Sequence, residues 1–343
     1  MSDLPSLMRR EIDEIPDAVD RLLSLGTRDI AAAARALANR NPACLVTVAR
    51  GSSDHICTYL KYASELVMGV PVASVGPSVA SIYQAPLRLG SSACLSVSQS
   101  GQSPDIVEMS RSARTQGALT IALTNAPQSP LAQVTEYPLN IHAGPEHSVA
   151  ATKTFVASAV AGLMLIAEWR RDEALLAAIR NLPVVLERAI AVDWGPVAGA
   201  LIGTGSLFTL GRGPAWAMSN EAALKFKETC QLHAESYSSA EVLHGPVSIV
   251  GDGFPVLCFA AADAARDQVV ATADALAEKG AQVFVTSDTA ARATSLPHVR
   301  SGHPLTDPIS LITTFYGLVE HIARTRGIDP DRPRHLSKVT ETL

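Results

Sequence analysis

The chain has 343 residues, of which 47% are hydrophobic and 18% are charged. This length suggests two domains, at roughly 100–200 residues per domain, and the composition suffices for large buried cores. A formal net charge of −5 and the lack of a basic run argue against nucleic acid as a partner, because backbone binding needs clustered Lys and Arg.

The sequence carries no sign of export or of a membrane anchor. Its N-terminus lacks a basic-then-apolar secretory pattern, and no stretch reaches the roughly 18 apolar residues of a membrane span. The most hydrophobic run, Phe155–Ile166, includes Ser158 and Gly162 and is predicted to be a buried core helix. The five cysteines form no C-x-x-C pair and lie in apolar surroundings, as is typical of a reducing compartment. We therefore expect a cytoplasmic protein with no membrane partner.

Short apolar runs alternate with longer amphipathic segments along the first half of the chain. This alternation is typical of α/β proteins, in which parallel strands are covered by helices. The expected strands are Cys44–Ala49, Val72–Val75, Ala93–Val97 and Leu119–Leu123, and the expected helices include Ile56–Met68 and Ile106–Thr115.

The same pattern starts again after about residue 195. Leu207–Gly213 mirrors Val46–Gly51 at an offset of 162 residues. Gly280–Asp288 mirrors Gly117–Asn125 at an offset of 163 residues. Two landmarks far apart in the chain keep nearly the same spacing, so the sequence predicts a duplicated α/β domain.

This duplication gives a predicted domain organisation. A helical, charge-dotted stretch, Arg171–Asp193, is expected to connect the two copies. The predicted segments are an N-terminal helical segment at 1–32, a first domain at 33–180, a second domain at 195–330 and a C-terminal tail at 331–343.

The two copies differ in the turn that follows their third strand. In the first copy it is the polar loop Ser98–Ser103, whereas the second copy has Ala260–Asp263, without hydroxyls. Ligands of open parallel sheets bind beyond the carboxyl ends of the strands, where a loop entering a helix offers N–H groups and a positive dipole to a phosphate. Three serines add donors, and Gly101 lets the backbone approach closely. A serine-rich turn without a ligand explains the loop alone equally well.

The second copy contains residues suited to acid–base chemistry. Lys225 and Glu228 are three apart, so they share one face of an otherwise apolar helix, and His244 precedes a Gly-Pro turn. Moving a proton between two carbons of an open sugar needs a carboxylate, and ring opening needs a group that titrates near neutrality. A lysine can form an imine with the carbonyl. By itself, the Lys–Glu pair is better explained as a surface ion pair.

Together these motifs resemble the SIS (sugar isomerase) domain family. The similarity to the isomerase half of glucosamine-6-phosphate synthase, and to stand-alone SIS-type deaminases, runs from about residue 8 to Leu343. It implies two tandem SIS domains, each a parallel sheet flanked by helices in a flavodoxin-like three-layer sandwich. The substrate-binding residues that it implies are Ser53, Ser98, Gln99, Ser100, Ser103, Val149 and Ser337.

The resemblance also assigns catalytic roles. Glu228 matches the family's proton-shuttling glutamate, with Lys225 beside it, and Lys338 matches a Schiff-base lysine in the C-terminal tail. His244 matches the ring-opening histidine, which the relatives take from the neighbouring subunit, so a homodimer with a shared active site is expected. Ala151 stands where the family usually has serine, and this departs from its pattern. No metal-ligand spacing, dinucleotide fingerprint or P-loop is present in the sequence, so we predict no cofactor and no metal.

The expected reaction follows from a comparison with these synthases. They take ammonia from glutamine through an N-terminal amidohydrolase domain, which this sequence does not show, so the site is expected to run in reverse as an isomerising glucosamine-6-phosphate deaminase. A galactosamine-6-phosphate deaminase/isomerase, a fructosamine-6-phosphate deglycase and an aldose–ketose phosphosugar isomerase stay open on the same scaffold. A non-catalytic phosphosugar-sensing regulator is the alternative from another class, and it predicts loss of the Glu, His and Lys set.

Overall fold

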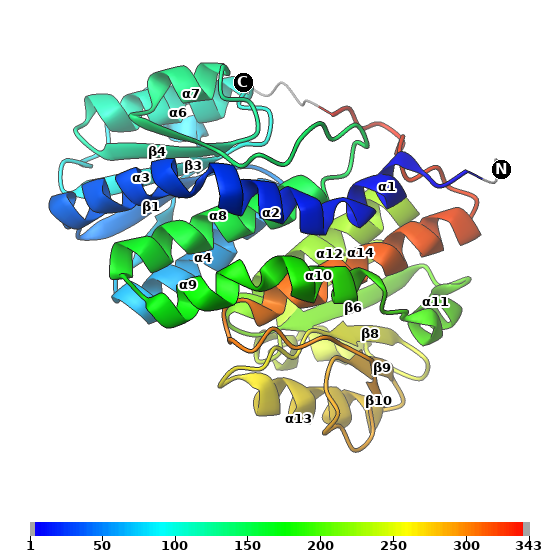
Figure 1. Cartoon of the computed structure of the whole chain (residues 1–343). Helices are drawn as coiled ribbons and strands as arrows, with labels where there is room; N and C mark the ends of the chain where they lie inside the picture. The colour runs from blue at the N-terminus through cyan, green and yellow to red at the C-terminus, as the bar shows by residue number, and fades with distance from the viewer. Residues whose placement is uncertain (1–3, 339–343) are drawn as a thin grey trace. The chain divides into compact units, whose positions relative to one another are not determined.

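The computed structural model describes residues 4–338, which fall into two compact units. The first unit comprises described residues 17–146, 153–180 and 337–338, and the second comprises 4–16, 147–152 and 181–336. Each unit contains one five-stranded sheet with helices around it (Figure 1). The predicted α/β class with two parallel sheets is confirmed, whereas the domain boundaries drawn from the sequence stay a prediction.

The first sheet forms from the apolar runs of the first half of the chain. Its strands are all parallel in the order β2-β1-β3-β4-β5, which is the flavodoxin-like order. The four predicted strands are present, and a short fifth strand was not predicted because it contains Pro138, which sequence patterns demote. The strands are β1 (Cys44–Val48), β2 (Val72–Ser74), β3 (Ser92–Val97), β4 (Leu119–Thr124) and β5 (Tyr137–Asn140).

Helices cover both faces of the first sheet, with α6 and α7 on one side and α3, α4 and α8 on the other (Figure 1). The predicted core helix is α8, which is buried along almost its whole length. A Cβ at Gly162 would lie 2.3 Å from Leu60, so glycine permits α4 and α8 to pack closely. The helices assigned to this region are α2 (Ile15–Leu25), α3 (Thr27–Arg40), α4 (Ser52–Met68), α5 (Ser78–Ser81), α6 (Pro104–Thr115), α7 (Pro130–Val134), α8 (Lys153–Arg170) and α9 (Glu173–Arg180).

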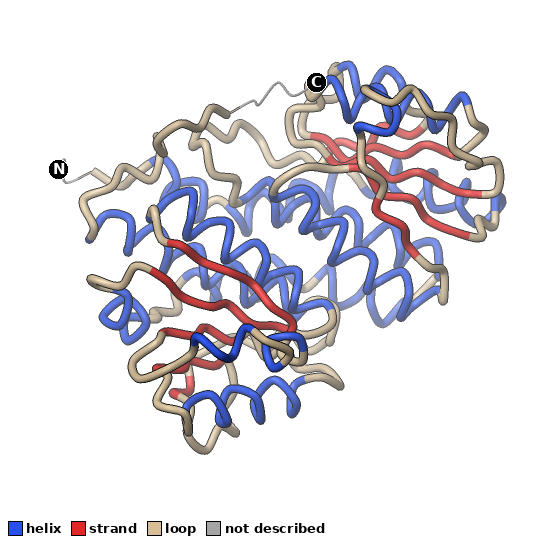
Figure 2. Tube along the Cα trace, turned by 180° about the vertical axis from the view of Figure 1, so that it is seen from behind, coloured by secondary structure: helices blue, strands red, loops and turns tan. Residues whose placement is uncertain are grey.

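The second sheet repeats this topology. Its order is β10-β9-β8-β6-β7, which is the order of the first sheet read from the opposite edge, and all its strands are parallel. Figure 2 shows the strands of each sheet lying side by side with helices around them. The duplication predicted from two sequence landmarks therefore holds in the strand order. The strands are β6 (Ser206–Gly211), β7 (His233–Ser238), β8 (Pro255–Cys258), β9 (Gln282–Val285) and β10 (Thr294–Ser295).

The second sheet is also covered on both faces. Helix α13 packs with Phe208 and Val256 in an apolar core, and α12 packs against β6, β7 and α14. None of the helices in residues 4–338 is long and apolar enough to cross a membrane. The helices of this unit are α1 (Leu7–Asp13), α10 (Leu182–Ile190), α11 (Gly195–Leu201), α12 (Pro214–Cys230), α13 (Arg266–Ala277), α14 (Asp307–Thr325), and the 3-10 turns η1 (Glu241–Leu243) and η2 (Pro246–Ile249).

Candidate functional site

The carboxyl ends of β1 and β3 mark the point where the strand order of the first sheet reverses. Val48 of β1 pairs with Ser96 of β3, so the turn after β1 and the loop after β3 leave the same edge of the sheet. Ligands bind at this point in folds of this order. The loop Ser98–Ser103 and the start of α4, where Ser53 is the second residue, thus belong to one edge of one sheet.

The loop Ser98–Ser103 has a defined shape because its backbone bonds to the end of the neighbouring strand β4. The carbonyl of Gln99 accepts the Asn125 N–H at 3.0 Å. Gly101 has φ +61°, and a Cβ there would lie 2.1 Å from the Ser129 hydroxyl oxygen. Backbone conformation and close approach therefore both require glycine at this position.

The hydroxyl oxygens of two loop serines accept hydrogen bonds from backbone N–H groups. Ser98 accepts the Gly101 N–H at 3.2 Å, and Ser100 accepts the Gln102 N–H at 3.3 Å. Each hydroxyl proton stays available for donation to an anion, because a serine oxygen can accept and donate at once. Ser103 stands at the N-cap of α6, where its side chain caps no N–H of the described helix.

An ion pair that the sequence did not reveal joins the two turns of this edge. Arg50, after β1, donates through Nε at 2.9 Å and through Nη2 at 2.6 Å to one carboxylate oxygen of Asp105. The Asp105 side chain is fully buried at the start of α6, whereas that of Arg50 is 51% exposed. A buried, uncompensated carboxylate here would repel a phosphate, and the positive charge of Arg50 compensates the negative charge of Asp105.

The second unit holds a buried cluster of charges on α12. Lys225 lies with its Nζ 3.1 Å from Glu221 and 2.5 Å from Glu228. The side chains of Lys225 and Glu221 are fully buried, whereas that of Glu228 is 21% exposed. The Tyr316 hydroxyl on α14 donates to Glu221 at 3.3 Å. Glu228 is therefore the member of the cluster that can meet a ligand.

Burial and charge oppose each other at Lys225. Desolvation by itself lowers the pKa of a buried lysine, but the carboxylates of Glu221 and Glu228 outweigh it and raise the pKa of Lys225 well above its usual value. The lysine thus stays a cation whose partner carboxylates are fixed in place. A surface ion pair, the alternative for Lys225 and Glu228 taken alone, is wrong because the ammonium is buried.

His244 lies in an exposed turn of the second unit. It ends η1, and its N–H bonds to the Glu241 carbonyl at 2.9 Å. Its side chain forms no hydrogen bond to any residue in 4–338. Two large apolar side chains nearby are also exposed, Leu243 at 51% and Ile249 at 59%.

Lys338 of the tail lies in the first unit. Its Nζ donates to the buried carboxylate of Glu146 at 2.9 Å, so the lysine is not the frayed surface charge that its place in the sequence suggests. Ser337 beside it is exposed. Val149 lies in the second unit, where its N–H bonds to the Asp331 carbonyl at 3.4 Å.

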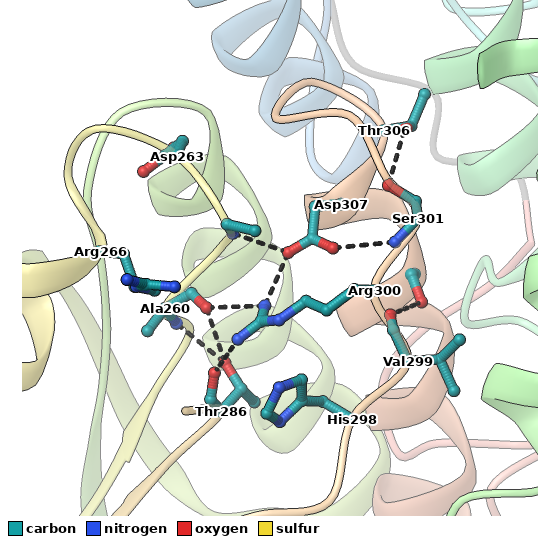
Figure 3. A network of polar contacts seen from close by, with 12 residues as sticks. Ala260, Asp263, Arg266, Thr286, His298, Val299, Arg300, Ser301, Thr306 and Asp307 are labelled. Carbon is teal, nitrogen blue, oxygen red and sulfur yellow. Dashed lines mark hydrogen bonds and ion pairs between the residues drawn. The ribbon is translucent and has the colours of Figure 1, made fainter. Parts of the chain in front are cut away.

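The matching edge of the second sheet is filled by the chain's own charges (Figure 3). The fully buried carboxylate of Asp307 accepts the Ala262 N–H at 2.8 Å and the Ser301 N–H at 3.1 Å. Arg300 donates to Asp307 at 2.7 Å and to two strand-end carbonyls, those of Ala260 and Thr286. The N–H that a phosphate would use in this copy is already bonded to a carboxylate.

The structure thus brings some predicted site residues together within each unit. The phosphate-loop residues and Ser53 share one edge of the first sheet, and Lys225 meets Glu228 on α12. Sequence reasoning missed Glu221, although its i, i+4 spacing to Lys225 was visible, and it missed Glu146, for which no local signal exists. Among residues 4–338 no cluster of three or more His, Cys, Asp or Glu side chains could hold a metal ion.

The fold and these two groups of residues define a tandem α/β protein with a serine-containing loop at one sheet edge and a buried cluster of charges on α12. Residues 40–168 and 200–296 match the family model of the SIS domain, and the chain belongs to this family.

Two comparisons with named proteins extend this assignment. The chain is 32% identical to the glutamine–fructose-6-phosphate aminotransferase (isomerizing) of Aeropyrum pernix, over 97% of this chain and 57% of that protein. The chain spans a little over half the length of the curated relatives that it matches. The chain is also 63% identical to a proposed phosphosugar isomerase from Silicibacter pomeroyi DSS-3 with a known crystal structure. The TM-score of that match is 0.93, and it covers 95% of this chain and 100% of that one.

A more distant structure shares the fold alone. The glucosamine-6-phosphate deaminase of Thermotoga maritima has 19% identity and a TM-score of 0.78, covering 98% of this chain and 100% of that one.

Proposed function

We propose that this protein is an amino sugar phosphate deaminase and isomerase that converts glucosamine 6-phosphate and water into fructose 6-phosphate and ammonia. The observation that carries the proposal is Glu228, a partly exposed carboxylate whose lysine partner is buried and shared with a second carboxylate. Such a group suits proton transfer between adjacent carbons. The curated relatives are named for fructose 6-phosphate, which supports a hexose phosphate as the substrate.

Phosphate recognition is assigned to the edge of the first sheet. The hydroxyls of Ser53, Ser98, Ser100 and Ser103 donate to the phosphate oxygens, together with N–H groups at the start of α6. Gln99, Val149 and Ser337 contact the sugar. The phosphate is bound largely by neutral donors, which agrees with the acidic net charge of the chain.

The chemistry is assigned to His244 and Glu228. His244 gives a proton to the ring oxygen as the ring opens and takes one from the hydroxyl on carbon 1. Glu228 then removes the proton from carbon 2 while His244 returns its proton to the carbon-1 oxygen, which yields an enolamine, and Glu228 gives its proton to carbon 1. The product carries a C=N bond at carbon 2. Lys225 keeps the Glu228 carboxylate in place throughout.

Lys338 completes the reaction by exchanging one imine for another. Its amine adds to carbon 2, ammonia leaves, and the sugar is bound to Lys338 through a C=N bond. Water then adds to carbon 2, the C–N bond to the lysine breaks, and fructose 6-phosphate is released. Nitrogen leaves as ammonia and its place on carbon 2 is taken by oxygen from water, so the atoms balance.

The four buried cysteines within residues 4–338 are unsuited to releasing ammonia from glutamine. Release of ammonia from glutamine by a cysteine needs an accessible thiolate. Burial raises the pKa of Cys94 to about 11 and of Cys230 to about 12, and it raises the pKa values of Cys57 and Cys258 further. Cys44 lies half-buried within β1.

Ammonia release from a panel of phosphorylated amino sugars tests the proposal. We expect glucosamine 6-phosphate to give ammonia and fructose 6-phosphate in equal amounts, and Glu228→Gln to lower kcat by at least about 1,000-fold. Lys227→Gln, on the exposed neighbouring position, serves as the control and retains activity. Unaltered release by Glu228→Gln, or no release from any amino sugar phosphate in the wild type, overturns the proposal.

We also propose that His244 acts in a second copy of the chain, as in a homodimer. The exposed ring and the exposed apolar side chains Leu243 and Ile249 support this, because large apolar groups at a surface mark interaction sites. Mixing two inactive variants, His244→Ala and Glu228→Gln, is expected to restore up to about a quarter of the activity, because some mixed dimers then contain one intact site. No recovery after subunit exchange, or full activity of a dilute monomer, contradicts the shared site.

A further inference from the structure

Glu146 binds Lys338 in a way that suggests a role in the reaction. The Glu146 side chain is fully buried, and its Oε2 lies 2.9 Å from Lys338 Nζ. The same carboxylate accepts the N–H of Thr154 at 3.1 Å and its hydroxyl at 2.6 Å. All three residues belong to the first unit. A buried carboxylate is stable only when it is paired and hydrogen-bonded, and these contacts supply both conditions.

Helix α8 makes this carboxylate rigid. Thr154 is the second residue of α8, so its N–H is one of the four at a helix start that have no partner within the helix. Glu146 accepts that N–H and lies at the positive end of the dipole of an 18-residue helix. The charge partner of Lys338 is therefore fixed by a long buried helix, although Lys338 itself follows a segment without regular structure.

We infer that Glu146 is a positioning residue that holds the nitrogen of Lys338 and stabilises its positive charge through imine formation. This inference rests on the proposed function, in which Lys338 forms the imine. When the lysine ammonium condenses with a carbonyl, two of its protons leave with the carbonyl oxygen as water. The nitrogen keeps one proton and its charge of +1. The Glu146 carboxylate thus has a cation to pair with both before and after the step.

The test traps the imine chemically. Fructose 6-phosphate is added to the whole protein, sodium borohydride delivers hydride to the C=N carbon, and peptide mass mapping measures the secondary amine at Lys338. We expect Glu146→Gln to reduce the trapped fraction and kcat by about tenfold or more, with KM changed less than about threefold, because a charge-assisted bond to the reacting nitrogen is lost.

Two control variants separate this role from helix capping. Thr154→Val removes the hydroxyl bond to Glu146 but keeps the contact with Lys338. Glu136→Gln alters a glutamate that also accepts the N–H and hydroxyl of a threonine, Thr120, at 3.1 and 3.2 Å, and that pairs with no lysine in the described residues. Both controls are expected to trap the imine as the wild type does, whatever their melting temperatures.

The outcomes distinguish the inference from the function on which it rests. Selective loss of trapping in Glu146→Gln supports the inference. Normal trapping and kcat in Glu146→Gln overturn it and leave the proposed function intact. Equal loss in Glu146→Gln and Thr154→Val, in step with melting temperature, also overturns it, because capping of α8 then explains the effect. No adduct at Lys338 in the wild type overturns the imine step itself, and the role of Glu146 with it.

Discussion

The loop after β3 and the turn after β8 lie at matching edges of the two sheets, but the first presents serine hydroxyls and the second is occupied by a carboxylate of the chain itself. In the first sheet, the loop after β3 presents hydroxyls and a glycine turn, and the buried carboxylate of Asp105 at the start of α6 is paired with Arg50. In the second sheet, the turn after β8 has no hydroxyls, and Asp307 from α14 accepts its Ala262 N–H (Figure 3).

This difference teaches how a duplicated fold divides its tasks. A turn at the carboxyl end of a parallel strand presents N–H groups that need an acceptor. In one copy the loop's own Ser98 hydroxyl accepts such an N–H, from Gly101, and we propose that a ligand anion binds there, whereas the other copy supplies a carboxylate of its own. The second copy thus gains a fixed internal network at this edge, and the chemistry that we propose for it lies instead on α12, where Lys225 and Glu228 meet.

Removing the internal anion should give the largest effect on stability. Asp307→Asn leaves Arg300 without its carboxylate in a buried network, so we expect the free energy of unfolding to fall by about 3 kcal/mol. Urea unfolding measures this loss, and calorimetry should find inorganic phosphate binding at the first sheet unchanged. Asp267→Asn, which breaks an exposed pair with Arg266, is the control and should cost less than about 0.5 kcal/mol. Equal costs for both variants would show that the internal anion does not stabilise the second copy.

At the edge of the first sheet that carries the loop Ser98–Ser103, called the open edge below, a single added methyl group should have a large effect on phosphate affinity rather than on stability. In Gly101→Ala the new Cβ meets the Ser129 hydroxyl, so the loop must move, and we expect phosphate affinity to fall about 100-fold because several donors are displaced together. Gly69→Ala has a similar positive φ of +67° with no atom within 4 Å, so it is the matched control for backbone strain. If both variants bind phosphate as the wild type does, the loop is not the phosphate site.

Sequence reasoning captured the features that are encoded locally. The strand Cys44–Ala49 was predicted because a continuous apolar run bounded by polar residues marks a buried strand, and β1 spans Cys44–Val48. The loop Ser98–Ser103 stood out because its serines and glycine are adjacent in the chain. Whether these residues bind substrate stays a prediction, since the fold alone does not test it.

The missed features depend on partners that are distant in the sequence. Lys338 and Glu146 are 192 residues apart, and nothing near either residue indicates the other. Asp307 accepts an N–H from a turn more than forty residues earlier in the chain. The sequence of the turn by itself therefore indicated only that its hydroxyls are missing. Buried charges are also rare, and a general rule that places lysines at the surface argued against the observed burial of Lys225.

A smaller effect is expected from the arginine at the open edge. Arg50→Gln should weaken phosphate binding about tenfold, and less at high salt, because a half-exposed guanidinium is screened. Arg111→Gln, in an exposed pair on α6, is the control. The double variant Arg50→Gln/Asp105→Asn sharpens the interpretation. If it regains wild-type affinity, Arg50 acts only by neutralising Asp105, and if it does not, the guanidinium itself attracts the anion.

The smallest effect should come from a second carboxylate at the filled edge. Burial raises the pKa of Asp263, and the nearby charge of Asp307 raises it further, against hydrogen bonds from two backbone N–H groups. The folded state then holds the proton more tightly than the unfolded state, so Asp263 lowers stability as the pH rises above its usual range. Asp263→Asn is expected to stabilise the protein at pH 7 by less than about 1 kcal/mol, because Asp263 is partly exposed, and this gain should fade toward pH 4. Urea unfolding at both pH values checks the sign. A gain that persists at pH 4 would mean that the edge does not disfavour a second negative charge, and the contrast with the open edge would then rest on Asp307 alone.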